Sequence, residues 1–569
     1  SCTLHVYGSA AFDSGSGAAY ASASASVSIQ HGTLLASATG FEAPLIDPFP
    51  TTLATSWSVI DTLGGTTTLA RDLVLRGVTP GLLHTARGAP AATLGDSPGD
   101  GQQPWLMALE APPSGSCGSC LGRIGSLALA SHTCALAENG QLRCWGSNDD
   151  GQVGDGSVLD QHFPAFVCAS GSYNGNDCVP LAGIAMVAAG DSHTCALRGS
   201  GQVVCWGNNN SGRLGDGTTD SHLNPVTVCA TGDLPHGTCV PLTNVAAIAA
   251  GAAHSCALRS DGNVACWGFG WVGQLGSGSS FLYTSSHPDS VCSTGSTLAG
   301  TCVPMPNATA LAAGNQHTCA IVENGSVKCW GVDVQAQLGA GVSSSLQHNP
   351  VTVCVTGSTA GNCDPLTGAF ALAAGAQHTC ALLQDGHVRC WGIRDQLGTG
   401  AAFAAAFSAH PVPVCRTGSS ADATCSELDQ VAAIAAGNAH TCALRESGEV
   451  LCWGSNLRGA LGNGQQSEVR YNPVVVCRSG STDGGDCAPL SGTAAIAAGD
   501  QHSCALRDDG SMQCWGKGDE GQLGDPRAGG IFSALHPGGV CLTTVDNLCV
   551  PLEDAALRQC VALVVEVAP

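Results

Sequence analysis

Cysteine and histidine are the residues of this chain whose number and spacing point to chemistry. The chain holds 32 Cys and 18 His, and a phrase that begins His-Thr-Cys or His-Ser-Cys and ends Cys-Trp-Gly occurs seven times. The first copy, HTCALAENGQLRCWG, runs from His132 to Gly146 and places its two cysteines ten positions apart. Such residues can pair as a disulfide, hold zinc through thiolate and imidazole, or exchange thiols as a redox pair.

The regular pairing of the cysteines favours disulfides over zinc. Zinc binding by every copy would need seven separate metal sites and would leave each cysteine unbridged. We therefore expect one disulfide in each copy. The expected pairs are Cys134 with Cys144, Cys195 with Cys205, Cys256 with Cys266, Cys319 with Cys329, Cys380 with Cys390, Cys442 with Cys452, and Cys504 with Cys514.

A tight hairpin must position each of these pairs. In every copy a Gly lies six positions after the first Cys, as Gly140 does after Cys134. If Cys134 faces Cys144 across antiparallel strands, the loop is a three-residue turn whose last residue is Gly140, and such turns favour Gly there. Counting outward makes the cysteines a non-hydrogen-bonded pair, with Cα atoms about 4.5 Å apart, close enough for a disulfide.

A second set of paired cysteines follows each copy and encloses Gly, Ser, Thr, Asn and Asp in varied order. We expect disulfide-closed loops that project from one face of the molecule. They are either recognition loops on a rigid scaffold or solvated connectors. The expected pairs are Cys168 with Cys178, Cys229 with Cys239, Cys292 with Cys302, Cys354 with Cys363, Cys415 with Cys425, Cys477 with Cys487, and Cys541 with Cys549.

The whole repeat predicts a propeller. Each copy follows a small apolar run such as AMVAAG and precedes a glycine-rich turn and a strand such as PVTVC, and the copies recur every 61 to 63 residues. Four short strands per period, repeated seven times, predict an all-β fold with a seven-bladed β-propeller. One Trp per copy should fill the space between neighbouring blades. These residues are Trp145, Trp206, Trp267, Trp330, Trp391, Trp453 and Trp515.

The order AAG-x-x-H-[TS]-x-A-L, then a hairpin ending in Trp-Gly, then G-x-L-G-[DTS]-G resembles the regulator-of-chromosome-condensation repeat family over about residues 121 to 550. The resemblance implies a seven-bladed propeller. It also implies that the recurrent His, such as His132, is a structural residue bonded within its blade rather than one of a ring of metal ligands. The paired cysteines of each hairpin and the second cysteine-bounded insertion depart from the eukaryotic pattern of this family.

Composition indicates where such a chain works. Thirty-two Cys favour an oxidising compartment, and we expect an extracellular or cell-surface protein with Ser1 as its mature terminus. The formal net charge of −23 repels a phosphate backbone, so we expect no nucleic-acid partner. No apolar run approaches 18 residues, so we expect no transmembrane helix.

Segments outside the repeat give a division into four parts. Residues 1–111 alternate small apolar and hydroxyl residues, as in AAYASASASVSIQ, and predict a small β-rich, sandwich-like domain. Residues 112–120 form a linker with a CxxC motif, 121–553 the propeller, and 554–569 a closing or donor strand. Four cysteines, Cys2, Cys117, Cys120 and Cys560, lie outside the repeats, and three connectivities are open to them.

No catalytic motif appears, and we expect no enzyme activity, cofactor or metal. The chain has no G-x-S-x-G, phosphate loop or H-E-x-x-H, and its acidic turns lack the spacing of an EF-hand. We expect an extracellular structural protein that self-associates, in a filament or surface layer, on a disulfide-stapled propeller. The alternative is a secreted protein-binding module or enzyme inhibitor that acts through its loops. Compartment and charge oppose nucleotide exchange on a small GTPase, which the resemblance also implies.

Overall fold

The chain divides into two compact units in the computed structural model. One unit comprises Gly122–Glu553, and the other comprises Ser1–Leu121 with Asp554–Pro569. The structure describes residues 124–551 except 138–139, 280–282, 360, 401–403, 467–468, 526–532 and 546–547. Before residue 124 it describes only the strands at 2–13, 18–30, 33–38, 73–74 and 93–94, without their side chains.

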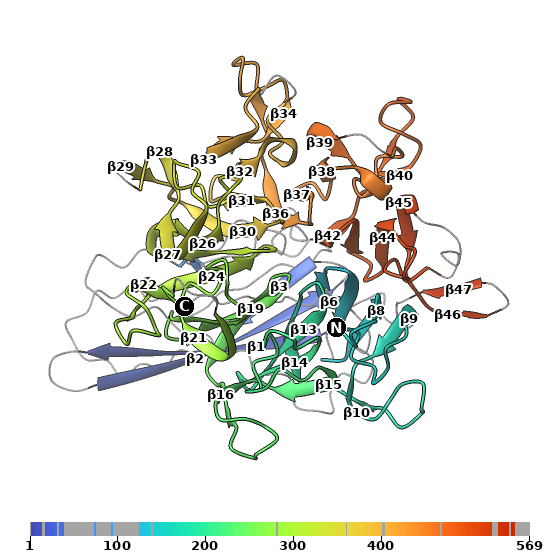
Figure 1. Ribbon diagram of the computed structural model, residues 1–569. Coiled ribbons are helices and arrows are strands. Elements are labelled where there is room, and N and C mark those ends of the chain that lie inside the picture. Colours follow the sequence, from blue (N-terminus) through green and yellow to red (C-terminus); the bar gives the residue numbers. More distant parts are fainter. Residues whose placement is uncertain are drawn as a thin grey trace. The chain divides into compact units, whose positions relative to one another are not determined.

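The larger unit is a propeller of seven blades, as the repeat predicts. Each blade is a four-stranded antiparallel sheet whose strands pair in chain order, and each blade is followed by a two-stranded hairpin. The first strands of neighbouring blades contact one another around the ring, so they form its inner wall (Figure 1). The blades comprise β6–β9, β12–β15, β18–β21, β24–β27, β30–β33, β36–β39 and β42–β45.

The strands of blades 1 to 4 have these bounds: β6 Ile124–Leu129, β7 His132–Ala137, β8 Leu142–Gly146, β9 Gln161–Phe166; β12 Ile184–Ala189, β13 His193–Arg198, β14 Val203–Gly207, β15 His222–Thr227; β18 Val245–Ala250, β19 His254–Arg259, β20 Val264–Phe269, β21 Thr284–Ser290; β24 Ala308–Ala313, β25 His317–Val322, β26 Ser326–Val332, β27 Leu346–Thr352. Those of blades 5 to 7 are β30 Ala369–Ala374, β31 His378–Leu383, β32 Val388–Ile393, β33 Phe407–Pro413; β36 Val431–Ala436, β37 His440–Arg445, β38 Val450–Gly454, β39 Arg470–Val475; β42 Thr493–Ala498, β43 His502–Arg507, β44 Met512–Lys517, β45 Ser533–Gly539.

The hairpins after the blades are built from shorter strands: β10 Cys168–Ser170 with β11 Val179–Pro180, β16 Cys229–Thr231 with β17 Val240–Pro241, β22 Cys292–Thr294 with β23 Val303–Pro304, β28 Cys354–Ser358 with β29 Gly361–Pro365, β34 Cys415–Thr417 with β35 Ser426–Glu427, β40 Cys477–Ser479 with β41 Ala488–Pro489, and β46 Cys541–Val545 with β47 Leu548–Pro551. Three one-turn 3₁₀ helices interrupt the described connections, at Glu323–Gly325, Arg394–Gln396 and Leu457–Gly459.

The turn between the second and third strands follows the predicted geometry. The Ala137 amide donates to the Gln141 carbonyl at 2.9 Å and the Gly140 amide donates to the Ala137 carbonyl at 2.9 Å. Gly140 has φ of 76°, a left-handed conformation that Gly adopts without the penalty of a Cβ atom. Cys134 therefore lies directly opposite Cys144 in the register of the two strands.

The hydrophobic core lies between blades rather than inside them. Trp206 of blade 2 packs with Leu136 and Val153 of blade 1, and Trp145 of blade 1 packs with Leu506 and Leu523 of blade 7. All seven repeat tryptophans are fully buried, which confirms that they fill the spaces between blades. Each blade buries its apolar residues only when a neighbour is present, so the stability of the ring depends on its closure.

Blade 7 closes the ring directly against blade 1. The Asp500 amide donates to the Ala130 carbonyl at 3.0 Å, and Thr133 Oγ1 lies 2.7 Å from His502 Nε2. All four strands of blade 1 come from the continuous stretch 124–166. The ring is thus joined by packing and hydrogen bonds between complete blades.

The smaller unit has two described sheets. Strands β1 Cys2–Asp13, β2 Ala18–Gln30 and β3 Thr33–Ala38 form one antiparallel sheet in that order, and β4 Leu73–Val74 pairs with β5 Thr93–Leu94. Strand β2 is the alternating Ala/Ser segment expected to be a strand, whereas β1 was not among the predicted strands. The rest of the predicted sandwich-like domain, the CxxC linker and the C-terminal strand lie outside the described residues, as do the side chains of Cys2, Cys117, Cys120 and Cys560.

Candidate functional site

Seven disulfides lie inside the blades, and we call them the core disulfides. They join the seven cysteine pairs of the repeated phrase, with Cα atoms 4.1 Å apart in each. Every one of their cysteines is buried, with at most 1% of its surface exposed. Each core disulfide therefore ties the second strand of a blade to the third within the inter-blade core.

Six further disulfides close the hairpins that follow blades 1 to 6, and we call them the rim disulfides. Their Cα atoms lie 5.1–5.3 Å apart. The first cysteine of each pair, such as Cys229, is fully buried, whereas the second, such as Cys239, is partly exposed. Cys541 also belongs to a disulfide, but the side chain of Cys549, its predicted partner, lies outside the described residues. Peptide mapping of the unreduced protein checks this connectivity.

Each hairpin is held by the next blade rather than standing free on one face. Asn224, on the outer strand of blade 2, donates to the carbonyls of Cys168 and Gly171 at 2.9 and 3.0 Å. Figure 1 shows the hairpins at the periphery of the ring, so the expectation that they project from one face was wrong. The chain leaves each outer strand at the edge of the sheet, and the hairpin there reaches the neighbouring outer strand.

The residue that holds each of the hairpins after blades 1 to 6 is Asn or His followed by Pro, and we call it the clasp residue. Asn349 and Asn472 repeat the two bonds of Asn224. In the alternate blades, His287 bonds the Gly232 carbonyl at 2.7 Å, and His410 and His536 bond the carbonyls of Cys354 and Cys477. Sequence reasoning missed these residues, although an Asn-Pro or His-Pro dipeptide five positions before the rim cysteine repeats in blades 2 to 7.

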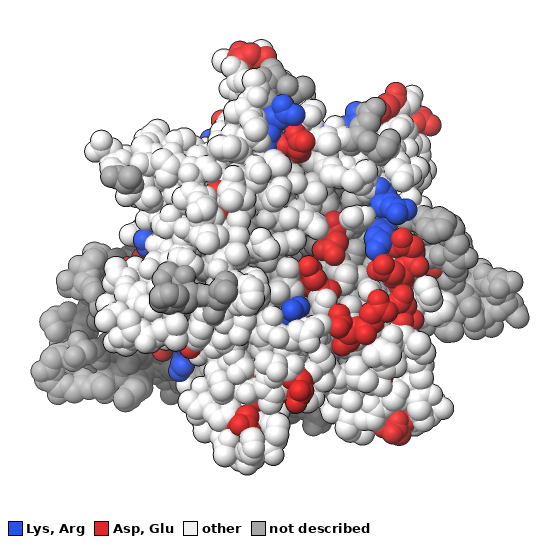
Figure 2. Space-filling view, viewed as in Figure 1, with Lys and Arg blue, Asp and Glu red and all other residues white. Residues whose placement is uncertain are grey.

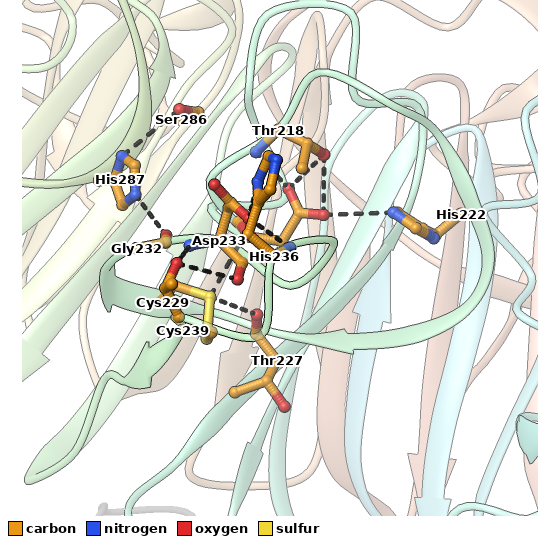
Figure 3. The surroundings of a disulfide bond; sticks show 12 residues. Thr218, His222, Thr227, Cys229, Gly232, Asp233, His236, Cys239, Ser286 and His287 are labelled. Carbon is orange, nitrogen blue, oxygen red and sulfur yellow. Dashed lines mark hydrogen bonds and ion pairs between the residues drawn. A yellow bond between two sulfur atoms is a disulfide. The ribbon is translucent and has the colours of Figure 1, made fainter.

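The hairpin tips share one internal framework. A side-chain oxygen near the second cysteine accepts a hydrogen bond from a backbone amide of the tip in five of the hairpins: Asp177 from Ser172, Thr238 from Asp233, Thr301 from Ser296, Thr424 from Ser419, and Asp486 from Ser481. Between these anchors the residues differ, and they include Tyr173, His236 and Leu298, which are exposed. Hairpins with the same anchors thus present different side chains around the ring, and Figure 3 shows one of them, closed by Cys229 and Cys239.

The recurrent histidines form a closed ring of hydrogen bonds between blades. Each Nε2 lies 2.6–2.8 Å from the Thr or Ser hydroxyl at the second position of the phrase in the next blade, from His132 with Thr194 around to His502 with Thr133. The expectation that this His bonds within its own blade was therefore wrong. A single repeat does not contain the partner, so only ring closure completes the bond.

The hydroxyl at each junction determines which ring nitrogen of the histidine carries the proton, and burial keeps the ring neutral. Thr379 Oγ1 donates to the Gln337 carbonyl at 3.0 Å, so it accepts from His317 Nε2, at 2.8 Å. Trp391 Nε1 donates to the same carbonyl at 2.9 Å. Burial lowers the pKa of His317 to about 3, because the charged imidazolium loses its hydration. The histidine is neutral, with its Nε2 atom protonated.

A glycine packs against each of these imidazoles in blades 2 to 7. A Cβ atom on Gly190 would lie 2.3 Å from His193 Cε1 and 2.4 Å from the Gly251 carbonyl oxygen. No side chain fits there, which explains the invariant Gly of the Ala-Ala-Gly run. The imidazoles are buried, and in the described part of the chain no group of three or more His, Cys, Asp or Glu residues is arranged to hold a metal ion.

Acidic side chains gather at the junction of blades 7 and 1, and Figure 2 shows them over β8, β9 and β44. In blade 1, two residues lie between the inner strand and His132. In blade 2, three residues lie between the inner strand and His193. Asp191 and Asp500 follow the inner strands of blades 2 and 7, on either side of this shortened turn. Burial and the charge of Asp191 raise the pKa of Asp500 to about 7. Burial also raises the pKa of Asp191, against the opposing effect of Arg213.

Comparison with known proteins agrees with this geometry. A family model described as the RCC1-like domain matches residues 124–425, and models of the regulator of chromosome condensation (RCC1) repeat match residues 431–460, 494–522 and 447–506. The chain belongs to the RCC1-like domain family. The resemblance inferred from the repeated phrase is therefore confirmed.

Relatives of this RCC1-like chain have varied roles. The ultraviolet-B receptor UVR8 of Arabidopsis thaliana is 26% identical over 70% of this chain and 81% of the receptor. The human E3 ubiquitin-protein ligase HERC2 is 27% identical over 47% of this chain, which spans only 5% of that ligase. The crystal structure of Prp20p from Saccharomyces cerevisiae, described with its binding to Gsp1p and histones, has a TM-score of 0.52 at 21% identity, over 74% of this chain and 87% of Prp20p.

Within the part of the chain that the structure describes, no helix is both long enough and apolar enough to span a membrane.

Positively charged residues are few, with Lys and Arg together numbering 20 in the whole chain against 43 Asp and Glu. An anionic surface of this kind repels phosphate groups and attracts cations.

Proposed function

We propose that this chain is a non-enzymatic protein-binding platform of an oxidising, extracellular compartment, and that it recognises its partner through the hairpin tips. The observation that carries this proposal is the rim itself. Six hairpins share one disulfide-closed frame, yet their exposed tip residues differ. Rigid loops with variable side chains are the usual means by which a scaffold achieves specific recognition.

Three further observations support this proposal. The clasp residues fix each hairpin to the adjacent blade, so binding need not order a flexible loop and loses less entropy. Relatives supply a parallel, since Prp20p is described by its binding to other proteins. The disulfides favour an oxidising compartment.

The test replaces tips and leaves the frame intact. In each variant the residues between the tip anchors of one hairpin, such as 234–237, are replaced by Gly and Ser while both cysteines stay. The unreduced protein is then used to capture proteins from the extracellular fraction of its source, with a variant altered at an exposed blade residue, Asp261→Asn, as the matched control. Capture of a protein that is lost with particular tips, and kept in the control, supports the proposal. Capture that no tip variant alters contradicts it.

Self-association into a filament or surface layer is the second candidate, and a feature of the smaller unit favours it. Strand β1 spans Cys2–Asp13 and, among the described strands, pairs only along one edge, with β2. A long open edge can pair with a strand of another copy. Light scattering and electron microscopy of the native, unreduced protein test this: ordered polymers support it, and a monomer at high concentration contradicts it.

A further inference from the structure

The disulfides of the described residues fall into two sets that differ in access to solvent. Both cysteines of a core disulfide are buried, as Cys195 and Cys205 are, with 1% and 0% of their surfaces exposed. They pack with Leu197, Val203 and Trp267. A rim disulfide instead ends in a partly exposed cysteine, such as Cys239. Thiol exchange requires a thiolate to reach one sulfur of the bond, so access separates the two sets chemically.

The surroundings of Cys229 and Cys239 show why a rim disulfide can open alone (Figure 3). Cys239 is followed at once by β17, a strand of only two residues, Val240–Pro241. The hairpin base is held independently of the disulfide, because His287 of the next blade bonds the Gly232 carbonyl at 2.7 Å. None of the inter-blade hydrogen bonds of the histidine ring passes through these cysteines. Loss of the disulfide therefore removes the covalent closure of the tip, which keeps only its short-range hydrogen bonds, and leaves the ring intact.

We propose that the rim disulfides are a redox switch, which thiol reductants open while the propeller stays folded, converting the hairpin tips from rigid to mobile. The functional meaning of the switch rests on the proposed role of the tips in binding. A rigid tip loses less conformational entropy on binding than a mobile tip, which must be ordered first. Reduction would thus weaken recognition, and oxidation would restore it.

The reaction is an ordinary thiol–disulfide exchange with a monothiol of the glutathione class as reductant. Its thiolate attacks Cys239 Sγ, the bond to Cys229 Sγ breaks, and Cys229 leaves as a thiolate that takes a proton from water. A second reductant thiolate then attacks the reductant sulfur of the mixed disulfide and releases Cys239 as a thiolate. Two thiols are oxidised to one small disulfide, and one protein disulfide is reduced to two thiols.

Graded reduction of the native protein tests the proposal directly. The unreduced protein is exposed to increasing concentrations of reduced glutathione and alkylated with N-ethylmaleimide, and the labelled cysteines are located by peptide mass spectrometry. Near-ultraviolet circular dichroism of the buried tryptophans reports the fold in parallel. We expect rim cysteines to be labelled first with an unchanged spectrum, and core cysteines only when the spectrum is lost. Simultaneous labelling of both sets, or rim labelling only after unfolding, would overturn the proposal.

Two matched double variants provide a second readout. Cys229→Ser with Cys239→Ser removes a rim disulfide, and Cys195→Ser with Cys205→Ser removes the core disulfide of the same blade. We expect the rim variant to keep the near-ultraviolet spectrum and a thermal midpoint within a few degrees of the parent, and the core variant to unfold at a clearly lower temperature or to fail to fold. Equal losses in both variants would contradict the proposal. No partner is needed, so these results are independent of the tip-replacement test.

Discussion

At the scale of single residues, the hydroxyl between two blades makes two hydrogen bonds, whereas the side chain of the histidine beside it makes one. Thr379 Oγ1 accepts from His317 and donates to the Gln337 carbonyl, which Trp391 also bonds. Thr379 and Trp391 therefore meet at one backbone carbonyl, and His317 is linked to it through the Thr379 hydroxyl. The histidine is the recognisable residue of the repeat. Burial keeps it neutral, and this hydroxyl determines which of its ring nitrogens carries the proton.

Replacement of Thr379 by Val isolates the contribution of the hydroxyl. The Val side chain has nearly the same shape but leaves His317 Nε2 buried without an acceptor, which costs about 1–3 kcal/mol in the free energy of unfolding. Thr379→Ser is the matched control, because Ser255 and Ser503 occupy the same position in blades 3 and 7. Denaturant unfolding of the two variants measures the difference. Equal stabilities would show that the hydrogen bond contributes nothing.

Because Asp500 is buried, the free energy of unfolding should fall as the pH rises. Its pKa in the folded protein, about 7, lies above its ordinary value of 3.8, so the folded state holds the proton more tightly than the unfolded state. The stability that Asp500 contributes is complete below pH 4 and is lost as the pH rises to about 7. We expect Asp500→Asn to be more stable than the parent at pH 8, on the order of 4 kcal/mol for a shift of this size.

Measurement at pH 4.5 provides the internal control for Asp500→Asn. There the parent carboxyl is largely protonated and neutral, like the amide, so the two proteins should differ little in the free energy of unfolding. Unfolding curves between pH 4.5 and 8 therefore diverge as the pH rises. Parallel curves across this range would show that the carboxyl titrates as if exposed.

At the scale of elements, the clasp residue decides whether a hairpin is part of the ring. Asn472 donates to the carbonyls of Cys415 and Gly418 at 2.8 and 3.0 Å. We expect Asn472→Ala to increase amide hydrogen exchange several-fold in residues 415–427 and to leave the blades protected, because local opening no longer breaks these bonds. Asn472→His should stay protected, since His serves as the clasp in blades 3, 5 and 7.

The outcome that contradicts the clasp is equally specific. If Asn472→Ala exchanges at the parental rate in residues 415–427, the disulfide between Cys415 and Cys425 alone holds the hairpin. A uniform rise in exchange across the whole propeller would instead show that the clasp supports the ring. Hydrogen exchange resolved by mass spectrometry separates these three results.

The elements also show what the sequence could and could not predict. Seven copies of a fixed period are enough to predict seven blades. The Gly of each copy marks a tight turn, and the Trp of each copy marks a contact that every blade makes with its neighbour. The partner of His317 lies in another blade, at Thr379, so a single repeat cannot reveal it. The clasp was missed because two residue types, Asn and His, serve one function. The proximity of Asp191 to Asp500 requires both ring closure and the shortened turn of blade 1.

At the scale of the whole molecule, the ring is a closed circuit of contacts in which each blade completes its neighbour. The buried tryptophans and the His–hydroxyl bonds all cross from one blade to the next. The core disulfides, in contrast, act within single blades. Covalent bonds therefore hold each blade, whereas hydrogen bonds and apolar packing hold the ring. Conditions that protonate the buried histidines between blades should therefore open the ring before they unfold a single blade.

Acid is such a condition, and the seven histidines set its effect. Burial lowers the pKa to about 3 for five of them and to about 4 for His378, and it holds that of His193 well below its ordinary value. The unfolded chain takes up these protons near pH 6.5, so stability is complete above that pH and is lost as the pH falls towards 3. Each histidine contributes about 1.4 kcal/mol per pH unit in this range, and seven together outweigh the opposite effect of Asp500 and Asp191. Unfolding with the disulfides intact should take up about five to six protons net at pH 5, measured by potentiometry, because the histidines gain nearly seven while Asp500 and Asp191 release up to two. A net uptake near zero would contradict the neutral histidine ring.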